Sequence, residues 1–133
     1  MNDEILTFYR EQSAITRPGK HAALFTDLPQ TIEDLCKIVQ GLIIHYDTGE
    51  LYGCQISAER EREIDTRYVE RMLERMLERD PRSLSEARAP ELRLVGCCRD
   101  FSTMLCSLLR SKGIPARVRM VVNGLKVRTQ ILG

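Results

Sequence analysis

The chain has 133 residues, which is enough for one domain with a single hydrophobic core. Its 20 basic and 19 acidic residues leave a formal net charge of +1, and it contains no Trp. Binding to nucleic acid or to an anionic membrane surface needs an excess of Lys and Arg, so this composition argues against both partners.

The N-terminal sequence MNDEILTFYR lacks the basic and apolar regions of a secretory signal, and no apolar segment is long enough to span a bilayer. Five cysteines, an odd number, are scattered along the chain apart from the adjacent pair Cys97 and Cys98. These features predict a reduced, cytoplasmic protein. The chain has no CxxC pair and no histidine after the cysteine pair, so we expect no metal site.

Residues 1–56 are expected to form short helices and a loop. A helical pattern over 3–15 can be capped by Asn2 or Asp3, and TRPGK at 16–20 is typical of a turn. A second helix is predicted to begin at Thr31, which stands at capping-box spacing from Asp34. The sequence GLIIHYDTGELYG at 41–53 is an apolar run followed by turn residues.

The segment 57–80 is predicted to form one long amphipathic helix. Ser57 can cap its start, apolar residues recur at helical spacing from Ile64 to Leu77, and Asp80-Pro81 ends it. Its alternating Glu and Arg residues nearly cancel in charge, which favours a solvated helix face over a coiled coil or an RNA-binding helix. Residues 82–93 have the polar and Pro-containing composition of a loop.

Residues 95–133 are predicted to form a helix followed by a β-hairpin. Gly113 and Pro115 end the helix, and Asn123-Gly124 is a strong hairpin signal between strands at 116–122 and 125–132. The fold class is therefore α+β, dominated by helices. An apolar stripe of the helix is expected to be buried against the 58–79 helix and consists of Phe101, Met104, Leu105, Leu108 and Leu109.

The adjacent cysteines Cys97 and Cys98 stand where this helix begins. Unpaired backbone N–H groups and the positive end of the helix dipole stabilise a thiolate there and could hold an acyl oxyanion. Gly96 allows a tight entry into the helix, Arg99 adds a cation, and Asp100 can accept a backbone N–H. The spacing by itself fits two small half-buried cap residues equally well and does not show which thiol reacts.

The stretch GCCRDFSTMLCSLLRSKGIPARVR resembles the nucleophile motif of the transglutaminase-like superfamily. That motif reads Gly-x-Cys-Arg-Asp-Phe/Tyr-Ala, then an apolar helix, then Gly-Ile-Pro-Ala-Arg before a strand. The match is carried here by Gly96, Cys98, Arg99 and Asp100 and by residues 113–117. The resemblance implies that Cys98 is the catalytic nucleophile and that the other three residues support it.

The resemblance also implies a papain-like fold, in which a helix carries the cysteine and an adjoining sheet carries a histidine and then an aspartate. Members of the superfamily form a thioester from an amide carbonyl and pass the acyl group to an amine, to water or to another thiol. A protein, a peptide or a small amide is then the expected substrate. This chemistry implies no cofactor.

No histidine and no further aspartate follow the nucleophile motif in this sequence, and the two histidines, His21 and His45, both precede it. His21 is expected in a solvated loop, and His45 stands at the end of an apolar segment. Three interpretations remain. The chain is an active thiol enzyme that uses His45 as its base, or the nucleophile half of such an enzyme with little activity, or a non-catalytic interaction module that keeps the fold.

We favour the nucleophile half, because the half with the cysteine matches at every recognisable position whereas the half with histidine and aspartate is absent altogether. Residues 1–133 are then expected to form a single, C-terminally incomplete domain, made up of 1–56, the 57–80 helix, and the Cys98 helix with its hairpin over 95–133. The open edge of that hairpin predicts self-association through its last strand.

Overall fold

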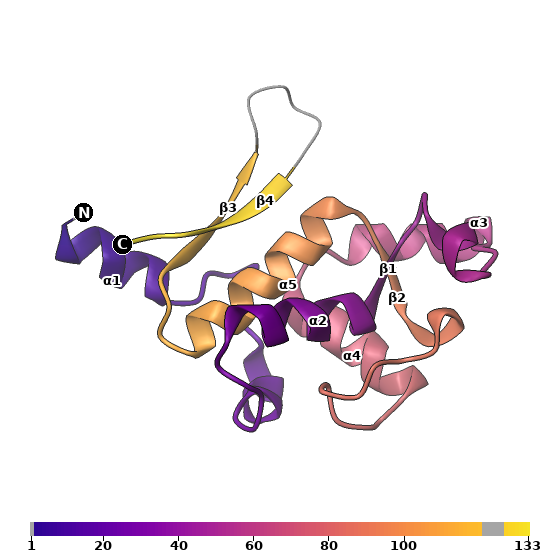
Figure 1. The fold of residues 1–133 in the computed structure, drawn as a ribbon, viewed down its shortest axis with the longest axis horizontal. Coiled ribbons are helices and arrows are strands. Elements are labelled where there is room, and N and C mark those ends of the chain that lie inside the picture. The colour runs from indigo at the N-terminus through magenta and orange to yellow at the C-terminus, as the bar shows by residue number, and fades with distance from the viewer. Residues whose placement is uncertain (1, 121–126) are drawn as a thin grey trace.

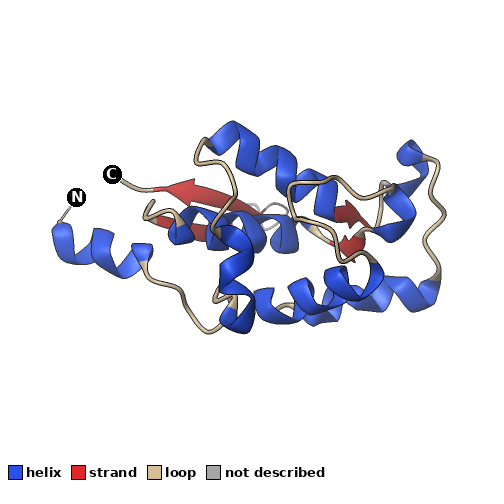
Figure 2. Ribbon diagram, turned by 90° about the horizontal axis from the view of Figure 1, so that it is seen from below, coloured by secondary structure: helices blue, strands red, loops and turns tan. Residues whose placement is uncertain are grey.

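The computed structural model describes residues 2–120 and 127–133. Helices dominate and the strands are short, so the predicted α+β class is confirmed (Figure 2). The α-helices of the described residues are α1 (Asp3–Arg10), α2 (Ile32–Leu42), α3 (Ala58–Glu61), α4 (Val69–Arg79) and α5 (Cys98–Ser111). Their strands are β1 (Ile43–His45), β2 (Leu94–Gly96), β3 (Ala116–Met120) and β4 (Val127–Ile131). Their 3₁₀ segments are η1 (Gly19–Phe25), η2 (Gly49–Tyr52), η3 (Arg62–Thr66) and η4 (Pro90–Leu92).

Helix α5 lies at the centre of the molecule, with α2 and α4 packed against it and the β3–β4 hairpin crossing it (Figure 1). Met104, Leu108 and Leu109 are fully buried, while Phe101 and Leu105 are half-buried against the same core. The apolar stripe predicted for this helix therefore faces the core. The stripe packs in one cluster with side chains of other elements, which include Phe25, Leu35, Leu42, Val69, Met72, Leu73 and Met76.

Several helix ends lie where local sequence signals predicted them. The side chain of Asn2 accepts hydrogen bonds from the backbone at the start of α1, and Thr31 accepts one from the backbone N–H of Asp34 at 3.3 Å. Helix α5 ends before Gly113, whose φ of 77° is a left-handed conformation that favours glycine. Each of these signals acts within a few residues, which is why the sequence predicts them well.

The single long helix predicted over 57–80 is wrong, because the structure divides this segment into α3, η3 and α4. Ser57 caps α3 as expected, and Asp80 follows the last residue of α4. Between them Arg67 takes a φ of 61° and a ψ of −42°, which no continuous helix permits. The backbone N–H of Val69 donates instead to the carbonyl of Ile15 at 2.9 Å, so a tertiary contact replaces a helical one.

The loop predicted over 82–93 is organised around one buried charged side chain. Arg88 is 2% exposed. Its guanidinium donates to the carbonyl oxygens of Asp80, Arg82, Ser83 and Glu86 at 2.7–2.9 Å. Because a buried guanidinium must keep its hydrogen bonds, this arrangement defines the course of the loop.

Strands β3 and β4 form the predicted antiparallel hairpin, with Ala116 opposite Ile131 and Met120 opposite Val127. The expected Asn123-Gly124 turn lies outside the described residues. The hairpin packs on α5 through side-chain hydrogen bonds, since Ser102 Oγ donates to the carbonyl of Val127 at 3.1 Å and Thr129 Oγ1 donates to the carbonyl of Ser102 at 2.8 Å. A two-stranded sheet needs such support to be stable.

Candidate active site at the start of helix α5

A short parallel pair of strands, which the sequence did not predict, positions the start of α5. Ile43, Ile44 and His45 of β1 lie opposite Leu94, Val95 and Gly96 of β2, respectively. The backbone N–H of Tyr46 continues the ladder by donating to the carbonyl of Gly96 at 3.0 Å. Because the strands are parallel, their carboxyl ends share one edge, where β2 leads into α5 and β1 ends at His45.

Gly96 is required by a close approach of other side chains. A Cβ atom at this position would lie 2.9 Å from Cγ2 of Ile43 and 3.0 Å from Cβ and Oδ2 of Asp100. The backbone of Gly96 does not have a positive φ, so the tight turn expected from the sequence is not what selects glycine here. Any larger residue would push β2 and the first turn of α5 apart.

Asp100 and Cys97 form the N-terminal cap of α5. The Asp100 carboxylate is 2% exposed and accepts the backbone N–H of Cys97 at 2.9 Å, as the sequence predicted. The Cys97 sulfur faces the backbone N–H groups of Arg99 and Asp100. Burial and the nearby Asp100 charge raise the pKa of the Cys97 thiol, and these N–H groups offset only part of the increase. Cys97 is therefore a capping thiol.

Cys98 is the first residue of α5 and is half-buried. Helical spacing places it on the same face as Phe101, Ser102 and Leu105. These three residues line a shallow cavity of about 340 Å³ with side chains of α2 and β4, among them Cys36 and Thr129. Cys98 thus lies on the helix face that borders a groove between α5, α2 and β4, one turn before the residues of α5 that line this groove.

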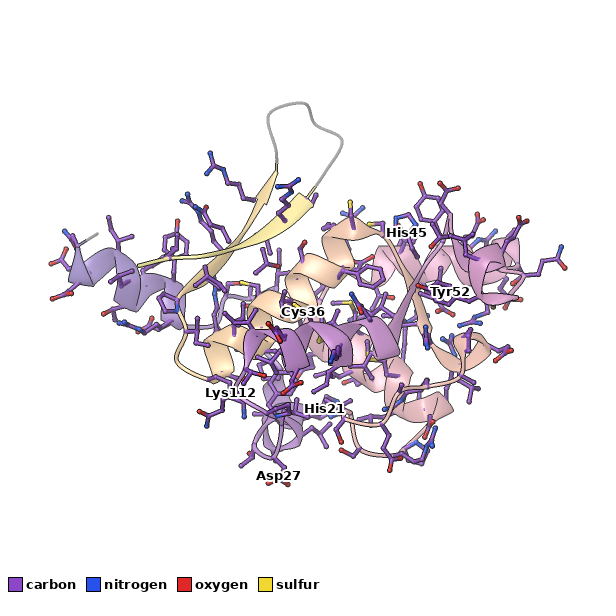
Figure 3. All side chains as sticks on the ribbon, in the orientation of Figure 1. His21, Asp27, Cys36, His45, Tyr52 and Lys112 are labelled. Carbon is purple, nitrogen blue, oxygen red and sulfur yellow. The ribbon has the colours of Figure 1, made fainter. Side chains whose placement is uncertain are left out.

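His45 lies beside the first turn of α5, whereas His21 lies on the other side of α2 (Figure 3). The His45 ring stacks on Phe101, with ring centroids 6.4 Å apart, and on Tyr46 at 4.8 Å. His21 is mostly buried beside Glu74, with 3.8 Å between Nε2 and Oε1, so its expected place in a solvated loop is wrong. Of the two histidines, the fold brings His45 to the cysteine pair.

The hydrogen bonding of His45 differs from that of a catalytic base. Its Nδ1 accepts the backbone N–H of Asp47 at 3.1 Å, so the neutral ring carries its proton on Nε2. In a catalytic triad the orienting group instead accepts a proton from one ring nitrogen, which leaves the other nitrogen free to receive the proton of the nucleophile. His45 therefore lies beside the first turn of α5 in a tautomer that does not suit a catalytic base.

Arg99 is directed away from the face that carries Cys98. Its Nη2 donates to the carbonyl of Ile64 at 2.8 Å and lies 3.4 Å from Oδ1 of Asp100. Its side chain lines a different cavity, together with Thr103 and Arg110. The Arg99 side chain therefore connects the first turn of α5 to η3 through its hydrogen bond to Ile64.

The sequence did not reveal the charged network that anchors β2. Glu63 is 5% exposed and accepts the backbone N–H of Val95 at 2.9 Å, and it forms ion pairs with Arg60 and Arg79. Burial by itself raises the pKa of the Glu63 carboxyl, but the hydrogen bonds from Arg79 and Val95 and the two arginine charges produce a net decrease. Within the Glu and Arg alternation of 57–80, no local signal distinguishes Glu63 from its exposed neighbours.

The described residues contain neither a membrane-spanning helix nor a metal cluster. No helix within 2–120 or 127–133 is long and apolar enough to cross a bilayer. The same residues bring no three His, Cys, Asp or Glu side chains together in a way that could hold a metal ion. The chemistry of this site is therefore argued from the thiols, His45 and the backbone donors.

Comparison with known proteins identifies the family of a chain that carries a half-buried thiol at the start of a central helix. The model of the transglutaminase-like superfamily matches residues 53–130, more than half of the chain. The chain belongs to the transglutaminase-like superfamily. No curated protein and no solved structure matches it significantly. The matched segment includes Cys98 and the whole of α5, whereas His45 precedes it.

Proposed function

We propose that this domain is the nucleophile-bearing part of a cysteine acyltransferase or amide hydrolase, with Cys98 as the nucleophile. The observation that carries the proposal is the division of roles in the cysteine pair. Cys97 occupies the cap, and Cys98 takes the first helical position, where it is half-buried on the helix face that carries Phe101 and Ser102. The backbone N–H of Cys98 lies in the first turn, where a helix supplies no acceptor for it. None of the described residues accepts a hydrogen bond from this N–H.

The proposed reaction begins with attack of the Cys98 thiolate on an acyl carbon. A C–S bond forms, the carbonyl π electrons move to oxygen, and the resulting oxyanion accepts the free N–H of Cys98. Collapse of this intermediate breaks the bond to the leaving group and produces a thioester. Water or an amine then attacks the thioester, which releases the acid or the new amide and returns the sulfur as thiolate.

Protonation of the leaving group separates ester substrates from amide substrates. An activated ester expels a stable anion, whereas an amine leaves only after it receives a proton from a positioned acid. General acid–base catalysis typically contributes about 10²–10⁴-fold, and a neutral His45 with its proton on Nε2 cannot receive the thiol proton at that nitrogen. We therefore expect these residues to attack activated esters through Cys98 and to turn over unactivated amides weakly.

An acyl-trapping experiment tests the nucleophile. The wild-type chain is incubated with an activated ester, and the acylated peptide is identified by mass spectrometry beside Cys98→Ala and the matched control Cys97→Ala. We expect the acyl group on Cys98, loss of ester hydrolysis in Cys98→Ala, and retention of it in Cys97→Ala. Acylation of Cys97, or hydrolysis that survives in Cys98→Ala, would show that the assignment is wrong.

A second candidate is an active thiol hydrolase that uses His45 as its base. The pairing of His45 with Gly96 and its stacking on Phe101 favour this candidate, because they hold the imidazole beside the first turn of α5. It requires the Asp47 hydrogen bond to break so that the ring can reorient. Amide turnover that disappears in both Cys98→Ala and His45→Gln, but not in His21→Gln, would establish this candidate in place of the first.

A further inference from the structure

A larger cavity, of about 680 Å³, lies on the other face of α5 from the cysteine site. Arg99, Thr103 and Arg110 of α5 line it, whereas Phe101 and Ser102 line the groove between α5, α2 and β4. Sites for small molecules typically occupy about 300–1,000 Å³, so this cavity is large enough for one. Arg99 and Arg117 of this lining belong to the superfamily motif, but the proposed acyl chemistry gives them no part in the reaction.

One wall of the cavity is apolar and open to solvent. Phe8 and Tyr9 of α1 meet edge to face with ring centroids 5.0 Å apart, and Ile15 and Val118 extend the same wall. Phe8 is 67% exposed and Ile15 is 48% exposed. Large apolar side chains gathered around a hollow in this way are typical of a binding surface for an apolar group.

Four arginines line the same cavity, and the acidic side chain among its lining residues is Glu11. The arginines are Arg67, Arg99, Arg110 and Arg117. Within the part of the chain that the structure describes, Arg99 forms a salt bridge with its neighbour Asp100, and the other three arginines form none. The cavity therefore carries positive charge that the described carboxylates do not neutralise.

Arg99 and Arg117 retain donors for a ligand, whereas Arg110 already donates through Nε to the carbonyl of Ala116 and through Nη1 to Oγ1 of Thr16. Arg110 and Arg117 both lie over the ring of Tyr9, with guanidinium carbons 5.9 and 5.7 Å from its centroid. Arg117 donates through Nε to Gln130, and no described residue accepts from its two terminal nitrogens. The Nε atom of Arg99 is buried and has no hydrogen-bond partner in the described part of the chain. A carboxylate or a phosphate would satisfy such donors, since guanidinium groups bind both in a forked geometry.

We propose that this cavity binds a small amphiphilic anion. Its carboxylate or phosphate head lies among Arg99, Arg110 and Arg117, and its apolar body lies against Phe8 and Ile15. Arg67, with its positive φ, faces the same cavity and adds to the attraction for the head. The site is independent of Cys98, so the ligand need not be the acyl donor.

Isothermal titration with four probes that share one alkyl chain tests the proposal. Octanoate and octyl phosphate carry the two candidate heads, 1-octanol carries none, and octylammonium carries the opposite charge. We expect saturable binding of at least one anion, at least about tenfold tighter than binding of 1-octanol or octylammonium and weakened by salt. The anion that binds more tightly identifies the head. Equal binding of 1-octanol, or no saturable binding of either anion, would overturn the proposal.

Variants then locate the site. Arg117→Gln should weaken anion binding by about tenfold, whereas Arg119→Gln, on the same strand but outside the cavity, should change it less than about twofold. Cys98→Ala should bind as the wild type does. If circular dichroism shows that Arg117→Gln is unfolded, Arg67→Gln provides the same comparison. An equal loss of affinity in Arg119→Gln would show that the anion binds by overall charge, and the assigned site would then be wrong.

Discussion

At its first turn helix α5 is held by hydrogen bonds and charges, whereas Met104, Leu108 and Leu109 of the same helix pack in the apolar core. The first turn depends on Asp100, on the close approach at Gly96, and on β2, which Glu63 anchors. The middle is fully buried at Met104, Leu108 and Leu109. The comparison shows that the thiol proposed as the nucleophile lies at a half-buried helix end, which hydrogen bonds and charges hold in place more than apolar packing does.

Thiol labelling should show the largest difference between the two regions. Cys98 is half-buried at the first turn, whereas Cys106 in the middle is 0% exposed and burial raises the pKa of its thiol. We expect iodoacetamide to modify Cys98 about a thousandfold faster than Cys106, because Cys106 must wait for the helix to open. Peptide mass spectrometry over a time course measures both rates.

Cys97 provides the internal control for this labelling. The pKa of its thiol is raised by burial and by the Asp100 charge, so it should react more slowly than Cys98. In denaturant all the cysteines should react at similar rates. Faster labelling of Cys106 than of Cys98 in the folded chain would contradict the comparison.

Truncation of the buried middle should have the next largest effect. Leu108→Ala removes a fully buried side chain and should lower the free energy of unfolding by about 2–5 kcal/mol. Leu105→Ala removes a half-buried side chain of the same size, so its cost should be about 1–2 kcal/mol. Urea unfolding measures both values. Equal losses would show that Leu105 belongs to the core as fully as Leu108 does.

Removal of the charged anchor should cost less than removal of the core. Glu63→Ala leaves the backbone N–H of Val95 and the Arg79 guanidinium without their acceptor, which should destabilise the fold by about 1–3 kcal/mol. Glu63→Gln keeps an oxygen for Val95 and should cost less. Glu61→Ala, at an exposed position nearby, is the control and should stay within about 0.5 kcal/mol of the wild type. A change in Glu63→Ala as small as that of the control would show that β2 does not depend on Glu63.

Lowering the pH should produce the smallest change in the free energy of unfolding, and this change should arise from protonation of buried carboxylates. The pKa of Glu63 is lowered in the folded chain, and hydrogen bonds from Arg82 lower the pKa of Asp80 to about 2. A carboxyl whose pKa is lower in the folded chain than in the unfolded chain stabilises the fold when it is ionised. This contribution is fully present above the unfolded pKa values of about 4.3 for Glu and 3.9 for Asp. It is lost as the pH falls toward the folded pKa. We therefore expect the free energy of unfolding to decrease between about pH 5 and pH 2.

Two neutral variants test the origin of this acid dependence. Glu63→Gln and Asp80→Asn should each make the decrease shallower, because each removes one group that takes up a proton on unfolding. Leu105→Ala should leave the slope unchanged. Urea unfolding at several pH values provides the measurement, and a slope unaffected by either neutral variant would assign the acid sensitivity to other carboxylates.

Elements defined by neighbouring residues were predictable. The cap at Thr31, the start of α5 at Cys98 and its end before Gly113 each depend on contacts within a few residues, and the hairpin pairs two strands that follow one another in the sequence. The superfamily was also predictable, because its motif is one continuous stretch that lies within α5 and the adjoining strands.

The middle of the chain was not predictable to the same degree. The pattern over 57–80 has the period of one helix, yet the structure turns Glu63 toward β2 and breaks the helix at Arg67. The contacts responsible join Glu63 to Val95 and Val69 to Ile15, residues far apart in the sequence. A local hydrophobic pattern contains no information about such partners.

The sequence by itself determined which thiols stand at the start of α5, which carboxylate caps that helix, and which side chains face the core. These properties follow from helical spacing and from hydrogen bonds between near neighbours. Only the tertiary structure decided that β1 pairs with β2, that His45 lies beside the first turn of α5, and that four arginines gather around one cavity. Each of these depends on side chains that the fold brings together from distant segments, and the spacing of residues along a chain does not specify such distances.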